Sequence, residues 1–363
     1  MFSLLLIDDT TKFLDELASD LGKLFNEDEV EIRTWEPTKD EANSLDVFDR
    51  LVDDNTILVV TDYDLTSKGR TGLFGSSIVG WCQARAIPVG DYSRGNNNSL
   101  PKEPNLFELR VPTDPEESAK YIASVYRGFK WIRERLAANP IILEKGSPSA
   151  VLAELLDVPD LEDQFGLYGG RFGTANGALL DRIMRTAPDD IEPSDEERKS
   201  LLGYIVGHLL LNSVLRFSGP ILSSNALAAY VASSDSEIGE LRKVFSEAAY
   251  SGPFSELDHF FWLWKVDELL EGFASGLAAD FSADTHGELN RAAVEVKLGR
   301  PLALHGCSRC SGKNGGFWCP FTRRVVCQKG ECSVGSNSWI PRGARLCRVE
   351  RDFYDEWAPI LGI

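Results

Sequence analysis

The alternation of strand and helix signals along residues 3–135 constrains the fold of this chain more than any other feature. Five short runs rich in leucine and β-branched residues are separated by segments with the apolar period of amphipathic helices. The strand-like runs are Ser3–Ile7, Val30–Thr34, Thr56–Thr61, Ile87–Asp91 and Leu106–Val111. The helical segments are Lys12–Phe25, Lys39–Val52, Gly75–Ala84 and Pro115–Leu136. This alternation predicts an α/β domain over residues 1–136, with a doubly wound five-stranded parallel sheet.

The rest of the chain divides into two stretches that differ in composition and in secondary-structure pattern. Residues 137–296 carry almost no strand signal and predict an all-α domain, and residues 297–363 are rich in Cys, Gly and Arg. The expected helices are Glu196–Leu215, Asn225–Ala232, Glu237–Ala249 and Leu257–Leu277. Ser194 with Glu197 three residues later is typical of a capping box, and His208 within an apolar run is typical of a core histidine. A length of 363 residues agrees with two or three domains.

The overall charge limits the partners of the chain. With 38 Lys and Arg against 56 Asp and Glu, the formal charge is −18, which argues against broad coating of nucleic acid or anionic membrane. The longest apolar runs, such as Ile205–Leu211, are far too short to span a bilayer, and no basic leader precedes Asp8. We therefore expect a cytoplasmic protein without a membrane anchor, in which clustered cysteines bind metal more often than they form disulfides.

Six of the seven cysteines lie between Cys307 and Cys347. The pairs Cys307-x2-Cys310 and Cys327-x4-Cys332 have the spacing of two metal-binding knuckles, and four thiolates suit a tetrahedral structural zinc site. Further candidate ligands are Cys319, Cys347 and His305. An iron–sulfur cluster is the alternative for ligands that are all cysteine. Gly306 stands where a zinc deaminase needs its catalytic Glu, so deaminase chemistry is not expected.

The cysteine-rich segment is also basic. Residues 297–351 contain 11 Lys and Arg but only two Glu, a formal charge of +9. The candidate basic patch consists of Arg323, Arg324, Arg342, Arg345 and Arg348, interleaved with Trp318 and Trp339. Arginines with aromatic residues bind nucleic acid through phosphate contacts and stacking. The same charges can also dock onto the acidic remainder of this chain or onto a protein partner, and we favour this intramolecular or protein-binding interpretation.

Polar residues follow the predicted strands of the first domain in a specific order. Asp8 and Asp9 follow the first strand, Asp62 the third, and Ser93 the fourth. In this order the chain resembles the receiver domain of bacterial response regulators over about residues 1–135. The resemblance implies that the three carboxylates meet at one edge of the sheet, where Mg²⁺ would relieve their repulsion. It further implies that Asp62 is the phosphoacceptor and that Ser93 contacts the phosphoryl group.

The fifth strand departs from the receiver pattern. Val111 precedes Pro112 where the family has a Lys, and Arg110 points to the opposite face of the strand. A phosphoryl group would therefore lack its counter-charge. This departure favours an inactivated receiver that serves as a docking module, with phosphorylation at Asp62 as the alternative.

These patterns predict a non-enzymatic signalling or regulatory protein with a helical partner-binding module. The resemblance implies a bacterial origin and a place in a sensing or antiviral system. The first alternative is a nucleic-acid-binding regulator that acts through the basic segment, and the second is an enzyme with its site in the helical domain. The glycine-rich segment Gly166–Gly177 lacks the Gly-Lys-Ser/Thr ending of a phosphate-binding loop, and no catalytic triad has sequence support.

Overall fold

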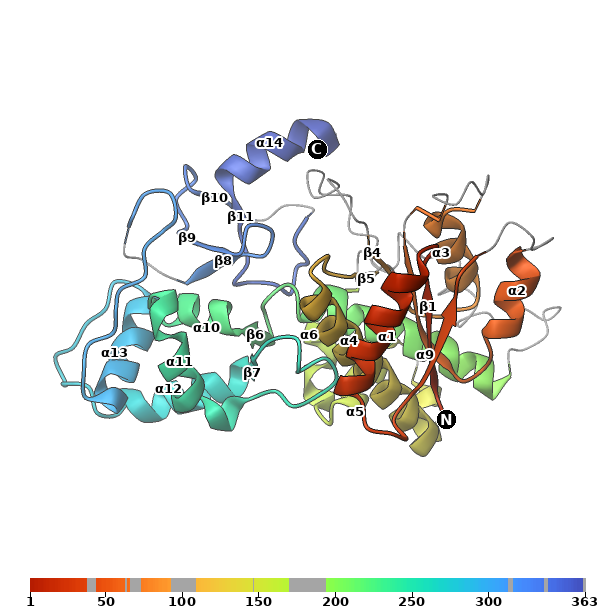
Figure 1. Ribbon diagram of the computed structural model, residues 1–363. Coiled ribbons are helices and arrows are strands. Elements are labelled where there is room, and N and C mark those ends of the chain that lie inside the picture. Colours follow the sequence, from red (N-terminus) through yellow and green to blue (C-terminus); the bar gives the residue numbers. More distant parts are fainter. Residues whose placement is uncertain are drawn as a thin grey trace. The chain divides into compact units, whose positions relative to one another are not determined.

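The computed structural model describes residues 1–37, 44–62, 64–65, 73–92, 109–145, 147–169, 194–312, 316–335 and 339–361. They group into two compact units, whose elements are labelled in Figure 1. The first unit comprises Met1–Val151 and Asn176–His208, and the second comprises Leu152–Ala175 and Leu209–Ile363. The division predicted at residues 136 and 296 rests on composition and stays a prediction.

A five-stranded sheet forms the centre of the first unit, and all of its neighbouring strands are parallel. The strands are β1 (Ser3–Ile7), β2 (Glu31–Trp35), β3 (Thr56–Asp62), β4 (Val89–Tyr92) and β5 (Leu109–Arg110). Their order is β2-β1-β3-β4-β5, one of the two common doubly wound arrangements. The predicted parallel sheet is confirmed, and its order places the carboxyl ends of β1, β3 and β4 side by side.

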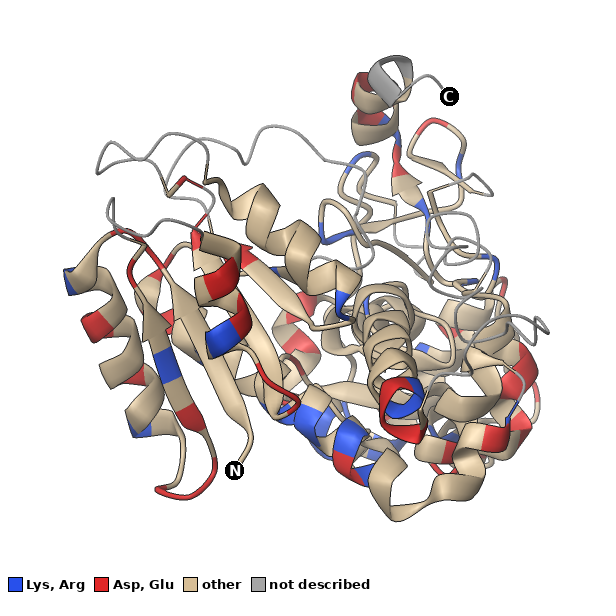
Figure 2. Ribbon diagram, turned by 90° about the vertical axis from the view of Figure 1, so that its right-hand side faces the viewer, with Lys and Arg blue, Asp and Glu red and all other residues tan. Residues whose placement is uncertain are grey.

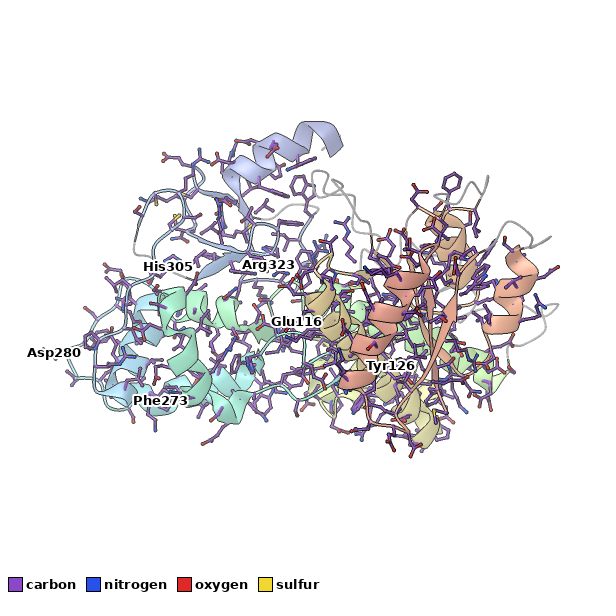
Figure 3. All side chains as sticks on the ribbon, in the orientation of Figure 1. Glu116, Tyr126, Phe273, Asp280, His305 and Arg323 are labelled. Atoms are coloured by element: carbon purple, nitrogen blue, oxygen red, sulfur yellow. The ribbon has the colours of Figure 1, made fainter. Side chains whose placement is uncertain are left out.

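Helices cover both faces of this sheet (Figure 1). They are α1 (Thr11–Leu24), α2 (Ser44–Leu51), α3 (Gly75–Ala84) and α4 (Pro115–Ala138). On one face, Phe48 of α2 and Ile78 of α3 pack in a buried cluster with Val59 of β3. On the other face α1 packs against α4, which carries Tyr126 (Figure 3). The rings of Phe25 and Tyr126 lie 5.3 Å apart between centroids.

Helix α9 (Asp195–Leu209) adds to the first unit by packing on α4. Its start has the predicted capping box, because Ser194 N donates to Glu197 Oε2 at 2.9 Å and Glu197 N donates to Ser194 Oγ at 3.3 Å. Gly207 faces the ring of Phe129 so closely that a Cβ atom would lie 2.2 Å from its Cε1. His208 is fully buried between Tyr204 and Phe129, which confirms the predicted core histidine. Burial lowers the pKa of His208 to about 3.

Short helices dominate the first half of the second unit, and a π-helical turn over Leu210–Val214 follows α9. The helices are α5 (Pro148–Leu155), which crosses the boundary between the units, α6 (Glu162–Gly166), α10 (Ser224–Tyr230), α11 (Ile238–Val244), α12 (Leu263–Ala274) and α13 (His286–Leu298). The all-α prediction is confirmed only in part, because β6 (Ile221–Ser223) and β7 (Phe260–Trp262) form an antiparallel pair. The predicted helix at Leu257 therefore begins only at Leu263. The run Phe260–Trp264 is apolar throughout, so its sequence shows neither a helical nor a strand period.

Among its described residues, the cysteine-rich half of the second unit (297–363) contains two small antiparallel strand pairs and one helix. They are β8 (Phe317–Cys319) with β9 (Arg324–Val326), β10 (Ser333–Val334) with β11 (Val349–Glu350), and α14 (Arg351–Leu361). Phe353 and Trp357 of α14 pack on Trp339 and Val349 in an aromatic cluster. Among the described residues, no helix has both the length and the apolar character needed to cross a membrane.

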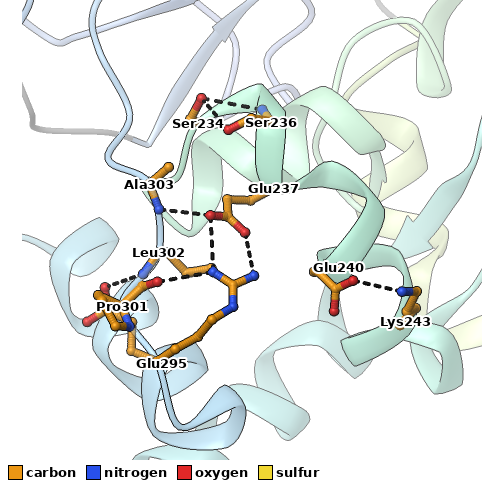
Figure 4. Close-up of polar contacts among 10 residues, drawn as sticks. Ser234, Ser236, Glu237, Glu240, Lys243, Glu295, Pro301, Leu302 and Ala303 are labelled. Carbon is orange, nitrogen blue, oxygen red and sulfur yellow. Dashed lines mark hydrogen bonds and ion pairs between the residues drawn. The ribbon is translucent and has the colours of Figure 1, made fainter.

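A polar contact joins the helical and cysteine-rich halves of the second unit (Figure 4). Arg300 donates to both carboxylate oxygens of Glu237, at 3.2 and 2.8 Å, and the backbone amide of Ala303 donates to the same carboxylate at 3.0 Å. Glu237 stands at the start of α11, so this contact fixes the chain that leads from α13 into the cysteine-rich half.

Candidate metal centres

Four cysteines of the second unit converge on one point. Cys307 and Cys310 lie in one turn before β8, Cys327 directly follows β9, and Cys332 directly precedes β10. Their sulfur atoms all lie within 4.8 Å of one another, and Sγ of Cys310 is 3.8 Å from Sγ of Cys327. Zinc–sulfur bonds of about 2.3 Å in a tetrahedron separate the sulfurs by about 3.8 Å, whereas a disulfide needs about 2.05 Å. The two predicted knuckles therefore form one group of thiols compatible with a metal ion.

Burial and backbone amides shape the chemistry of these thiols. Cys307, Cys327 and Cys332 are buried and pack together, whereas Cys310 is exposed. Burial alone raises the pKa of Cys307, but the amides of Cys310 and Arg309 among others stabilise its thiolate and lower the pKa to about 7. Burial raises the pKa of Cys332. The lowered pKa of Cys307 favours its thiolate, which is the form of cysteine that binds metal.

The three additional candidate ligands lie outside this group of thiols. Sγ of Cys319 accepts a hydrogen bond from the amide of Glu350 at 3.3 Å, and Sγ of Cys347 donates to the carbonyl oxygen of Ser218 at 3.7 Å. Burial raises the pKa of Cys347. His305 is also buried, with its backbone amide bonded to the carbonyl oxygen of Ala232. The four-cysteine centre is formed without any of these residues.

The acidic residues of the first unit form a second cluster. Asp8 and Asp9 directly follow β1 and are buried, and half-buried Asp62 ends β3. Carboxylate oxygens of all three lie within 4.8 Å of one another. Asp8 accepts a hydrogen bond from the amide of Thr10 at 2.6 Å, and Asp9 accepts one from the Thr10 hydroxyl at 3.3 Å. The structure thus brings together the three aspartates that the resemblance to receiver domains implies at one edge of the sheet.

Tyr92 belongs to this acidic pocket of Asp8, Asp9 and Asp62, although it is not among the site residues predicted from the sequence. Its hydroxyl donates to Oδ2 of Asp8 at 2.6 Å, and its buried ring lies 5.0 Å from that of Phe13. It is the last residue of β4, next to the predicted Ser93, which lies outside the described residues. The sequence could have pointed to Tyr92, because it ends the strand β4, which finishes at the same sheet edge as β3 and Asp62.

The fifth strand supplies an apolar residue near this edge. Val111 directly follows β5, is buried, and bonds through its amide to the carbonyl oxygen of Asp91 at 3.0 Å. Arg110 is exposed, as expected from strand alternation. Val111 packs against Gly90, where a Cβ atom would lie only 2.9 Å from its Cγ2.

The five predicted basic-patch arginines differ in their surroundings, although all lie in the loops and strands of the second unit, where Figure 2 shows several blue segments. Arg324 pairs with buried Glu350 at 3.5 Å, and Arg348 is half-buried against Ser333. Arg323, Arg342 and Arg345 are exposed, and they form no ion pair within the described part of the chain. The structure therefore leaves three of the five predicted arginines available to a partner.

A cavity of about 820 Å³ lies in the first unit, at the sheet edge where β3 and β4 begin. Its walls come from α3, α4 and α9 and include Arg85, Arg133 and Tyr204. Arg85 pairs with Asp49 at 2.5 Å, and Arg133 donates to the carbonyl oxygen of Asp54. Because these cations are used in structural contacts, the cavity adds little support to the enzyme alternative.

No protein-family model matches this chain, and no curated protein or solved structure matches it either, so the functional proposal rests on the geometry of the fold and its two clusters.

Proposed function

We propose that this chain is a non-enzymatic regulatory protein with a receiver-like first unit and a zinc-stabilised second unit. The observation that carries the proposal is the meeting of Asp8, Asp9 and Asp62 at the carboxyl edge of a parallel sheet in the order β2-β1-β3-β4-β5. Ligands of open doubly wound sheets bind at this edge. Three carboxylates so close together repel one another, and Mg²⁺ relieves that repulsion through oxygen ligands.

The pocket favours docking over phosphotransfer. A phosphoryl group on Asp62 would carry a charge of about −1.5 to −2 and would need a cationic partner. Val111 offers a buried apolar side chain where the receiver resemblance leads us to expect Lys. We therefore assign the first unit a docking role for a protein partner that does not depend on phosphorylation.

Zinc is the metal that fits the four-cysteine centre best. Four thiolates complete a tetrahedral shell and leave no open position for a substrate, which is typical of a structural site. An iron–sulfur cluster would colour the protein, whereas zinc leaves it colourless. Metal analysis of the purified protein should give one zinc per chain, and iron with inorganic sulfide would contradict this assignment.

The acidic pocket can be tested by its response to Mg²⁺. A ligand that binds only the folded state stabilises it by mass action, so Mg²⁺ should raise the melting temperature of the first unit. Asp62→Asn removes one ligand and should abolish this rise. Asp64→Asn is the matched control, because Asp64 is exposed and lies only two residues away. An equal Mg²⁺ response in both variants would contradict a cation site at Asp62.

Phosphorylation is tested separately. Incubation with a small-molecule phosphodonor and Mg²⁺ should leave the intact mass of the protein unchanged. Stoichiometric addition of a phosphoryl group that is lost in Asp62→Asn would show an active receiver instead.

The second candidate function, nucleic-acid binding, is favoured by exposed Arg323, Arg342 and Arg345. Phosphate contacts release counterions, so binding should weaken steeply with salt. A double Arg323→Ala/Arg345→Ala variant should lose binding. Arg309→Ala should retain it, because Arg309 already pairs with Asp352 at 2.9 Å. Absence of binding by the wild type at low salt would eliminate this function.

A further inference from the structure

The guanidinium group of Arg348 donates hydrogen bonds to both ends of the chain segment Gln328–Ser333, which follows Cys327 and includes Cys332. Its Nε donates to Oγ of Ser333 at 2.6 Å, and its Nη2 lies 3.3 Å from the carbonyl oxygens of both Gln328 and Ser333. Gln328 directly follows Cys327, and Ser333 directly follows Cys332. One planar group therefore holds both ends of the loop that carries two of the four thiols.

Ser333 extends this contact to a ligand residue. Its side chain is fully buried, and its hydroxyl donates to the carbonyl oxygen of Cys327 at 2.6 Å while it accepts from Arg348. The hydroxyl thus ties the residue after Cys332 to the backbone of Cys327. Hydrogen bonds of this kind around a metal centre fix the positions of its ligands.

The ring of Phe317 and the backbone at Gly335 lie close to the guanidinium group of Arg348. The ring of Phe317 lies 5.2 Å from the guanidinium carbon, within the range of a cation–π contact. At Gly335 a Cβ atom would lie only 2.7 Å from Nη1, so a side chain at this position would displace the guanidinium. A position shaped in this way argues for a specific role rather than a surface charge.

The charge of the centre explains why a cation belongs there. A zinc ion with four thiolates has a formal charge of about −2, which is costly in a mostly buried site unless a cation lies nearby. Arginine stays protonated in such a place and presents several donors in one plane, which lysine cannot do.

We infer that Arg348 is a positioning residue of the metal centre, which fixes the Cys327–Cys332 loop and compensates the negative charge of the zinc with its four thiolates. This inference rests on the proposed zinc site. Arg348 is then a residue that raises metal affinity and no longer a member of the candidate basic patch.

The test measures zinc affinity of the full chain by competition with a chromophoric chelator, together with the absorption spectrum of the Co²⁺-substituted protein. Loss of such outer contacts typically weakens metal binding 10–100-fold, so Arg348→Gln should lower zinc affinity by about that factor. Arg348→Lys should recover only part of the loss, because it restores the charge but not the planar set of donors. Arg345→Gln is the matched control, since Arg345 is exposed and lies only three residues away.

The Co²⁺ spectrum separates positioning from a general loss of folding. Saturated Arg348→Gln should keep the tetrahedral thiolate bands, with changed intensity, which shows that all four ligands still bind. If Arg348→Gln does not fold even with excess zinc, Ser333→Ala decides the question and should weaken zinc affinity at least tenfold. Wild-type zinc affinity in Arg348→Gln, or in Ser333→Ala where the former does not fold, would overturn the inference. A wild-type chain that binds no zinc would instead remove the proposed zinc site itself, and with it this role.

Discussion

Tyr92 shows how a single buried hydroxyl can stabilise the acidic pocket. Its hydrogen bond to Asp8 is short and involves a charged acceptor, and such bonds contribute about 1.5–3 kcal/mol. Tyr92→Phe keeps the ring in place and removes only this donor. We therefore expect the free energy of unfolding, measured with urea, to fall by about that amount.

Tyr126→Phe provides the comparison within the same unit. The Tyr126 hydroxyl lies 3.4 Å from the carbonyl oxygen of Glu29, at the limit of a hydrogen bond. Its loss should cost clearly less than that of Tyr92. Equal losses in the two variants would show that the contact between Tyr92 and Asp8 contributes nothing special.

The residues of the two clusters could be predicted from the sequence to different degrees. The four-cysteine centre could be predicted from the sequence, because the short spacing within each knuckle limits how far apart its two thiols can lie. The meeting of Asp8, Asp9 and Asp62 could be predicted only through the resemblance to receiver domains, in which the parallel strands end at a common edge. Arg348 could not be assigned to the metal centre, because its contact with Ser333 depends on the pairing of β10 with β11.

At the scale of whole elements, helix α9 depends on two glycines with different neighbours. A methyl group at Gly207 would lie 2.2 Å from the buried ring of Phe129, whereas one at Gly203 would lie 3.5 Å from Leu136, an ordinary contact. Gly207→Ala should therefore destabilise the protein by about 1–3 kcal/mol through overpacking. Gly203→Ala should be neutral or stabilising by up to about 1 kcal/mol, since alanine favours helix. Thermal unfolding of both variants measures the difference, and equal effects would contradict this packing of α9 on α4.

The contact of Glu237 with Arg300 makes the second unit sensitive to acid. Hydrogen bonds from Arg300 and from the amide of Ala303 lower the pKa of Glu237 below its ordinary value of 4.5. A lowered pKa in the folded state gives stability that is complete above pH 4.5 and is lost as the pH falls further. Glu237→Gln should therefore cost about 1–2 kcal/mol at pH 7 and progressively less below pH 4.5, as measured by urea unfolding.

Figure 4 also shows the control for this prediction. Glu240 pairs with Lys243 at 2.7 Å on the same helix, but both side chains are exposed. Such surface pairs contribute little, so Glu240→Gln should leave the stability nearly unchanged at either pH. A loss that does not depend on pH in Glu237→Gln would point to packing instead of charge.

Strands and helices were easier to predict where their periods are clear. The bounds of β1, α3 and β3 agree with the sequence to within one residue, because each has an apolar core face and a distinct boundary. Strand β7 was missed because Phe260–Trp262 is uniformly apolar and its partner β6 lies 37 residues earlier in the chain. A local period cannot reveal such a pairing.

At the scale of the whole molecule, the charge of −18 is the sum of two unlike parts. Residues 297–351 carry +9 and the remainder carries −27. Within the second unit Arg300, Arg309 and Arg324 pair with acidic residues of that same unit. Part of the basic surplus therefore stabilises the unit that contains it, whereas exposed Arg323, Arg342 and Arg345 form no ion pair among the described residues.

Removal of the proposed zinc should destabilise the second unit and leave the first unit unchanged. The cysteine-rich half is held by strands of two or three residues and by small clusters, so we expect the free energy of binding the proposed zinc to supply much of its folding energy. The sheet of the first unit has its own buried core.

Hydrogen exchange of the full chain, measured by mass spectrometry with and without a zinc chelator, should show lost protection in peptides from residues 305–335. Peptides from β1 and β3 should keep theirs and serve as the internal control. Cys307→Ser should reproduce the effect of the chelator without any chelator present. Unchanged protection of residues 305–335 after metal analysis has verified zinc removal would mean that the four thiols and their neighbours hold this half together without a metal.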